Sequence, residues 1–224
     1  MCYYISMKES RQKFGFTLSE VLITLLVIGV VAVITINVIN NRYNEELART
    51  QFKNGYSLLT QAIKKTVMFD YLGNIPCYYT SPGLSDTWGE CKPFYNELAK
   101  NLNVTKTCNG NALKDKCIPK YTSNIPADSN CEGFSEEHIN EKSIAYVLVG
   151  GQILITYSSY TGPLFLFDIN GFKGPNKGGY DLFAFDILRD EHKNLNLNTS
   201  ATCRMLAPGG LTTEEMIYNS FSEE

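Results

Sequence analysis

The sequence has few of the residues and motifs that support catalysis or metal chemistry. Among its 224 residues there are only two histidines, which are isolated from each other, and no CxxC pair, so a zinc site is not expected. It also lacks a nucleophile elbow, a phosphate-binding glycine loop before a helix and a metalloprotease helix motif. The sequence therefore predicts that the protein is not an enzyme.

Charge is also scarce, because charged residues make up 19% of the chain and the formal net charge is -3. A nucleic-acid-binding protein normally has a basic excess, so no nucleic-acid partner is expected. The low charge, together with 14 Tyr and 12 Phe, excludes intrinsic disorder as the main state. The length suits one domain, or one domain with an appendage, and is ample for a hydrophobic core.

One long apolar run stands out near the N-terminus. The residues from Val21 to Ile39 carry no formal charge and would span about 28 Å as a helix, close to the ~30 Å of a bilayer's hydrocarbon core. A core helix usually keeps one polar face, and a secretory leader has a shorter apolar stretch before a small-residue cleavage site. Both alternatives fit poorly, and we predict a membrane-embedded helix.

Glu20 breaks the apolar pattern at the start of this run. A carboxylate so close to hydrocarbon costs a few kcal/mol unless it is protonated, paired or drawn to the interface. The simplest interpretation is an interfacial carboxylate that interacts favourably with the dipole at the N-terminus of the helix.

The residues around Glu20 indicate a second interpretation. Residues 13–21 read KFGFTLSEV, and Lys8, Arg11 and Lys13 make the preceding segment basic. This contiguous pattern resembles the cleavage and methylation site of type IV prepilins and type II secretion pseudopilins. The resemblance covers about thirty residues and says nothing specific about the rest of the chain.

The resemblance implies a processing site and an assembly residue. A prepilin peptidase would cut after Gly15 and N-methylate Phe16, and the apolar helix would stay attached to the product. Glu20 would pair with the terminal amine of a neighbouring subunit in a filament. A buried carboxylate and a buried ammonium each need a partner, so this pair would penalise packing out of register.

The cysteines indicate the compartment. Cys2 lies in the predicted leader, and the other six follow the apolar helix: Cys77, Cys91, Cys108, Cys117, Cys131 and Cys203. An even set on one side of a membrane predicts disulfides in an oxidising space. Six cysteines allow fifteen pairings, of which sequence proximity favours Cys77–Cys91 and Cys108–Cys117, leaving Cys131–Cys203.

The helix is expected to continue beyond the membrane. No proline occurs before Pro76, so one helix can run from about Phe16 to near Asp70. Steps of three and four residues mark an apolar stripe on its second half, made of Phe52, Tyr56, Leu59, Ile63 and Val67.

The remainder predicts a sheet that covers this stripe. After a loop-rich stretch with a short helix near 93–101, strand-like patterns occur at 143–149, 152–157, 163–169 and 180–188. Gly150-Gly151 suits a tight hairpin between the first two. Four antiparallel strands on the helix give an α+β, pilin-like fold with disulfide-stapled loops, and a short helix is expected within 211–221.

The connection between the last two strands contains Asp168, Asn170 and Asp181. These side chains offer the hard oxygen ligands that Ca²⁺ prefers, although the spacing is not that of an EF-hand. The alternative, which we favour, is a glycine-rich turn whose Asp and Asn side chains cap their own backbone.

Together with these patterns, the resemblance implies a prepilin leader (1–15), a transmembrane or filament-core helix (16–41) and an extracytoplasmic head (42–224). The head divides into a helix half (42–70), a cysteine-rich connection (73–142), a sheet (143–189) and a tail (190–224). The expected function is a structural pilin or pseudopilin subunit of a bacterial inner-membrane system. Its expected partners are the prepilin peptidase, other pilin subunits, an inner-membrane assembly platform and the membrane itself. The alternative is a membrane-anchored extracytoplasmic receptor head that does not polymerise.

Overall fold

The computed structural model describes residues 15–70, 88–121, 139–140, 143–159, 162–189, 195–198 and 206–222. The chain divides into two compact units, Met1–Glu45 and Glu46–Glu224. The described helices are α1 (Leu18–Asp70), α2 (Trp88–Asn101) and α3 (Thr213–Phe221). The described strands are β1 (Val104–Asn109), β2 (Ile144–Leu148), β3 (Ile153–Ser159), β4 (Gly162–Asp168), β5 (Leu182–Arg189) and β6 (Leu195–Asn198).

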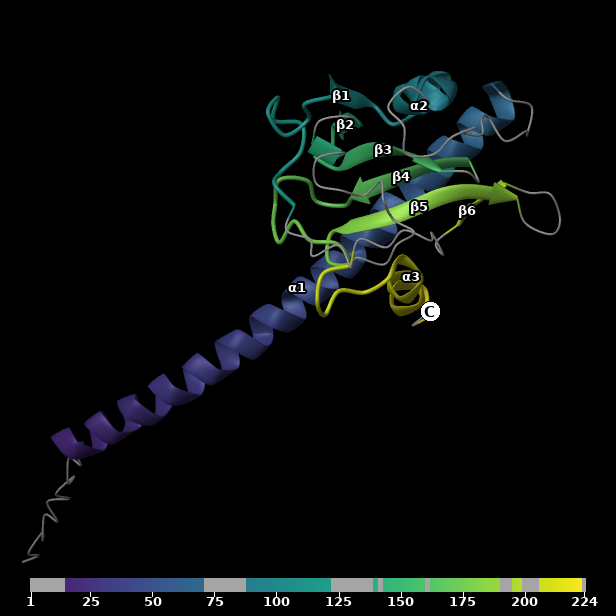
Figure 1. Cartoon of the computed structure of the whole chain (residues 1–224). Coiled ribbons are helices and arrows are strands. Elements are labelled where there is room, and N and C mark those ends of the chain that lie inside the picture. Colours follow the sequence, from purple (N-terminus) through teal and green to yellow (C-terminus); the bar gives the residue numbers. More distant parts are fainter. Residues whose placement is uncertain are drawn as a thin grey trace, which may run out of the picture. The chain divides into compact units, whose positions relative to one another are not determined.

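The strands form one antiparallel sheet in the order β1-β2-β3-β4-β5-β6 (Figure 1). Strands β2 to β5 confirm the four that the sequence predicts, and the Gly150-Gly151 turn joins β2 to β3 as expected. Gly151 has a φ of 86°, and its N–H donates to the carbonyl of Leu148 at 2.9 Å. The expectation of only four strands was wrong, because β1 and β6 extend the sheet at its two edges.

The second half of α1 supplies the core of the larger unit. Phe52, Leu59, Ile63 and Val67 are each at most 2% exposed, which confirms the predicted stripe, and Tyr56 is half-buried. Their neighbours are the sheet's aromatic residues. The Phe52 ring meets that of Phe183 edge-on at 4.9 Å and lies 6.3 Å from that of Phe185. Such aromatic pairs add to the stabilisation that burial alone provides.

The other two helices pack against the same core. On α2, the Tyr95 hydroxyl donates to the carbonyl of Leu164 in β4 at 2.7 Å, and Asn101 donates to the buried Thr66 hydroxyl of α1 at 2.8 Å. Helix α3 begins with a capping box between Thr212 and Glu215. The predicted helices at 93–101 and 211–221 are both present, although α2 begins five residues earlier than expected.

A second apolar cluster covers the opposite face of the sheet. The segment after β1 places Ala112, Ile118 and Tyr121 against sheet residues such as Ile155 and Leu166. The Cys108–Cys117 disulfide closes this segment and confirms the predicted pair. The result is a sheet with helices on one face and a disulfide-closed loop on the other, which is an α+β pilin-like fold.

The remaining cysteine predictions are not decided by the described residues. Cys91 is 0% exposed and disulfide-bonded. Because Cys108 and Cys117 bind each other, the partner of Cys91 lies outside the described residues. Cys77, Cys131 and Cys203 also lie there, so the Cys77–Cys91 and Cys131–Cys203 pairs stay predictions.

Candidate processing and assembly segment

The predicted cleavage site lies in non-helical backbone immediately before α1. Residues Gly15 to Thr17 are outside the helix, which begins at Leu18. The side chain of Phe16 is 88% exposed. The bond between Gly15 and Phe16 therefore lies in exposed, non-helical backbone.

Glu20 closes the first turn of α1 through a capping box with Thr17. Both the backbone N–H and the hydroxyl of Thr17 donate to Glu20 Oε2 at 2.8 Å, and the N–H of Glu20 donates to the Thr17 hydroxyl at 3.3 Å. This arrangement satisfies donors that a helix start otherwise leaves unpaired. The predicted favourable position of Glu20 at the helix N-terminus is thus explained by particular bonds. The role of Thr17 was not predicted, although Thr-x-x-Glu is a recognisable capping pattern.

The apolar residues that follow are exposed on every side of the helix. From Val21 to Ile39, the large hydrophobic side chains are each between 43% and 69% exposed. A contiguous apolar surface of this extent is not stable in water. By its length and composition, α1 contains the one candidate membrane span among the described residues, and it lies near the N-terminus.

Two of the three polar side chains within this apolar stretch, Thr24 and Thr35, bond to their own helix. The Thr24 hydroxyl donates to the carbonyl of Val21 at 2.9 Å, and the Thr35 hydroxyl donates to the carbonyl of Val31 at 2.9 Å. Such bonds satisfy a hydroxyl without a partner from outside the helix. These two hydroxyls can therefore enter a hydrocarbon environment without being left unpaired.

The second candidate site is the β4–β5 loop, where the structure brings together the three predicted oxygen-bearing residues. Asp168 Oδ1 accepts from the N–H groups of Asn170 and Gly171, at 3.0 and 2.6 Å. Asp168 Oδ2 accepts from the Tyr121 hydroxyl at 2.8 Å. Asp181 accepts from the N–H groups of Asn176 and Lys177, at 2.6 and 2.7 Å. Both carboxylates thus hold the backbone of their own loop.

Burial changes the proton affinity of this cluster. Asp168 is 0% exposed, and burial, followed by the charge of nearby Asp181, raises its pKa to about 7. Burial likewise raises the pKa of Asp181. Tyr121, whose pKa is raised by burial and then by the charge of Asp168, anchors the disulfide-closed segment to this loop. No sequence pattern marked Tyr121, which lies 47 residues from its partner.

Comparison with known proteins supports the processing segment. Residues 10–36 match the family model described as the prokaryotic N-terminal methylation motif, the signature of type IV pilins and pseudopilins. The match supports a pilin- or pseudopilin-type precursor anchored in a membrane by its apolar helix. No curated protein and no solved structure matched the chain.

The raised pKa of Asp168 predicts a pH dependence of stability. Between the unfolded value of about 4 and the folded value of about 7, only the folded chain holds this proton, so its stabilising contribution is complete below about pH 4 and is lost as the pH rises through 7. Asp168→Asn keeps an oxygen for the backbone N–H groups but does not titrate. In thermal unfolding, the stability of this variant relative to the natural chain should increase as the pH is raised from 5 to 8.

The matched control is Asp115→Asn, which removes an exposed carboxylate from the neighbouring segment. Its melting temperature should change with pH in the same way as that of the natural chain. If the Asp168→Asn and natural curves stay parallel between pH 5 and pH 8, the buried carboxylate does not titrate as described.

Proposed function

We propose that this chain is the precursor of a structural filament subunit, a pilin or pseudopilin. In this proposal, prepilin peptidase cuts it after Gly15, and the product assembles into a type IV pilus or a type II secretion-like filament. The observation that carries the proposal is the exposed Gly15–Phe16 bond placed directly before a helix whose apolar residues face outward on all sides. The methylation-motif match over residues 10–36 supports it.

The proposed role of the apolar helix follows from what cleavage leaves behind. A cut after Gly15 removes the basic leader but keeps Val21 to Ile39 on the product, so the subunit stays in the bilayer. Lipid surrounds these side chains before assembly, and the helices of other subunits replace it in the filament. The disulfide-bonded head is then extracytoplasmic, because disulfides persist in oxidising compartments.

Glu20 would change its hydrogen-bonding partner when the subunit assembles into the filament. In the precursor, Thr17 supplies its hydrogen bonds. After cleavage, the terminal amine of Phe16 on a neighbouring subunit is the proposed counter-ion in the apolar filament core. Two buried groups of opposite charge stabilise only the register that brings them together, since either one alone is strongly unfavourable there.

We further propose that the β4–β5 loop requires no resident metal ion. Each carboxylate oxygen of Asp168 accepts a bond from its own chain, and Asp181 accepts two backbone N–H bonds. These bonds hold the loop backbone in place, as a bound calcium ion would, and this supports the turn interpretation. The unpartnered buried oxygens of Asn170 and Asn176 are the feature that favours calcium instead.

Processing is tested by the intact mass of the chain isolated from membranes. The mature chain should lack residues 1–15 and carry one additional methyl group on Phe16. An intact leader, or cleavage at any other bond, would contradict the proposal and favour the membrane-anchored receptor.

Assembly is tested with Glu20→Gln, which keeps an oxygen for the Thr17 bonds but removes the charge. Processing should be unchanged, whereas incorporation into filaments should fall by at least ~100-fold, because leaving one member of a buried ion pair unpaired costs about 3–5 kcal/mol. Glu46→Gln is the control, since it removes an exposed carboxylate that pairs with the half-buried Arg49 and should change little. Equal filament yields from the two variants would exclude the register role.

The metal-free loop is tested by thermal unfolding of the full chain with Ca²⁺ and with a chelator. The melting temperature should be the same in both conditions. If Ca²⁺ raises the melting temperature of the natural chain but not that of Asp168→Asn, the loop binds calcium.

A further inference from the structure

Two connections of the head meet at one end of the sheet. Ile153, which follows the β2–β3 turn, pairs with Asp168, which precedes the β4–β5 loop. The backbones of the two connections then touch, because a Cβ atom added at Gly171 would collide with the carbonyl oxygen of Gly151. The turn and the loop therefore form one continuous surface.

This surface presents two large apolar side chains to solvent. Val149 in the turn is 72% exposed, and Phe172 in the loop is 55% exposed. They immediately flank the contact between the two glycines, and neither belongs to the two apolar clusters of the head. Neither side chain stabilises the described fold by its burial, so the fold does not explain their apolar character.

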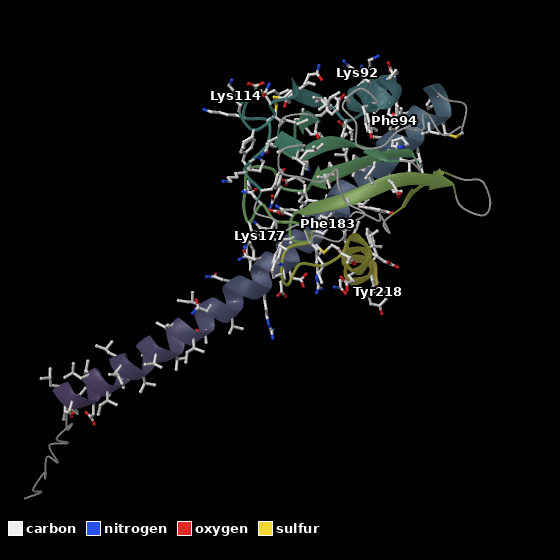
Figure 2. The ribbon with its side chains drawn as sticks, in the orientation of Figure 1. Lys92, Phe94, Lys114, Lys177, Phe183 and Tyr218 are labelled. Atoms are coloured by element: carbon white, nitrogen blue, oxygen red, sulfur yellow. A yellow bond between two sulfur atoms is a disulfide. The ribbon has the colours of Figure 1, made fainter. Side chains whose placement is uncertain are left out.

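The exposed charged side chains of the β4–β5 loop are both lysines. Lys173 and Lys177 are exposed on the loop, and Figure 2 labels Lys177 there. Lys120 is exposed beside Tyr121, whose hydroxyl binds Asp168. Among the described residues of 143–189, the carboxylates are those of Asp168, Asp181 and Asp186, and each is at most 5% exposed. Burial thus removes the carboxylates of the described residues of 143–189 from solvent, whereas Lys173 and Lys177 stay exposed.

The strands next to this surface pack on the part of α1 that belongs to the head unit. Phe167, at the end of β4, contacts Gly55 of α1, and Phe183, at the start of β5, contacts Phe52. Both contacts lie in the first turns of α1 within the head unit. In the sequence, these turns follow the apolar stretch that ends at Ile39.

We propose that Val149, Phe172, Lys120, Lys173 and Lys177 form a docking surface for the anionic lipid headgroups of the bilayer that holds α1. This inference rests on the proposed function, since it requires the membrane anchor. Each lysine near an anionic surface strengthens docking about fivefold, and an apolar side chain adds to this by entering the interface.

Lipid fits this surface better than a soluble polyanion does. A nucleic acid would be bound by lysines and by aromatic rings on which bases stack, and the aliphatic Val149 contributes to neither. Exposed aliphatic and aromatic side chains together with exposed lysines match instead the layered chemistry of a membrane interface, with apolar chains beneath charged headgroups. Docking would hold the head against the bilayer until the subunit joins a filament.

The test places a fluorescent reporter on the surface of the full chain. Phe172→Trp is made in a Trp88→Phe background, since the chain has one tryptophan. The chain is reconstituted into vesicles of phosphatidylcholine, with or without one part in four of phosphatidylglycerol, containing a lipid spin-labelled at the headgroup. Quenching of the tryptophan fluorescence at position 172 should increase with phosphatidylglycerol. Lys173→Glu with Lys177→Glu should weaken docking by at least ~25-fold and abolish the increase.

The control reporter is Tyr218→Trp in the same background, because Tyr218 is 71% exposed on α3, away from the loop (Figure 2). Its quenching should not depend on phosphatidylglycerol. Equal quenching of the position 172 reporter in both vesicles, or quenching unaffected by the lysine variants, would overturn the docking surface. A control reporter that responds as strongly would also overturn it.

Flotation of the vesicles separates this result from the proposed function. If the chain floats with vesicles but the position 172 reporter does not respond to anionic lipid, only the docking surface fails. If the chain does not float at all, the membrane anchor fails, and with it the proposed function. Binding of a single-stranded oligonucleotide without lipid-dependent quenching would overturn the lipid assignment in favour of a soluble polyanion.

Discussion

The structure depends on a single helix that needs two different surroundings. Along α1, residues 21–39 expose apolar side chains on every side, whereas residues 52–67 expose them on one stripe, which the sheet covers. Apolar burial at about 25 cal/mol per Å² stabilises the second part within the chain itself, but nothing in the described chain does the same for the first. Lipid or other apolar helices would supply it, which is consistent with the membrane anchoring that the apolar helix and the methylation motif suggest.

The same requirement explains how polar groups are arranged along the apolar part. The hydroxyls of Thr24 and Thr35 donate to backbone carbonyls of their own helix, and Thr17 donates to Glu20. A capping interaction contributes about 1 kcal/mol, whereas an unpaired charge in an apolar core costs several. Thr17 is therefore a sufficient partner for Glu20 at a hydrated interface, whereas in the proposed filament core an opposite charge would be needed to balance the carboxylate.

Sequence reasoning succeeded where a repeating pattern determines the structure. The stripe on α1, the strands β2 to β5 and the Cys108–Cys117 pair all follow from periodicity or proximity. It failed where the pattern is absent. Strand β1 is exposed over Thr105 to Thr107 because it lies at the sheet edge, and β6 has four residues, so neither shows a buried alternation. Proximity in sequence also could not show that Tyr121 binds Asp168, because only the folded chain brings them together.

In the β4–β5 loop, the inward orientation of Asp168 and Asp181 has two consequences. Turning Asp168 and Asp181 inward gives the loop its backbone bonds, at the cost of desolvating two carboxylates, and this desolvation raises their pKa values. The same inward turn leaves Lys173 and Lys177 as the exposed charges of the loop. An outward-facing carboxylate here would repel anionic headgroups and weaken the attraction of each lysine. The loss of stability at neutral pH and the positive surface therefore have a single origin in how the loop folds.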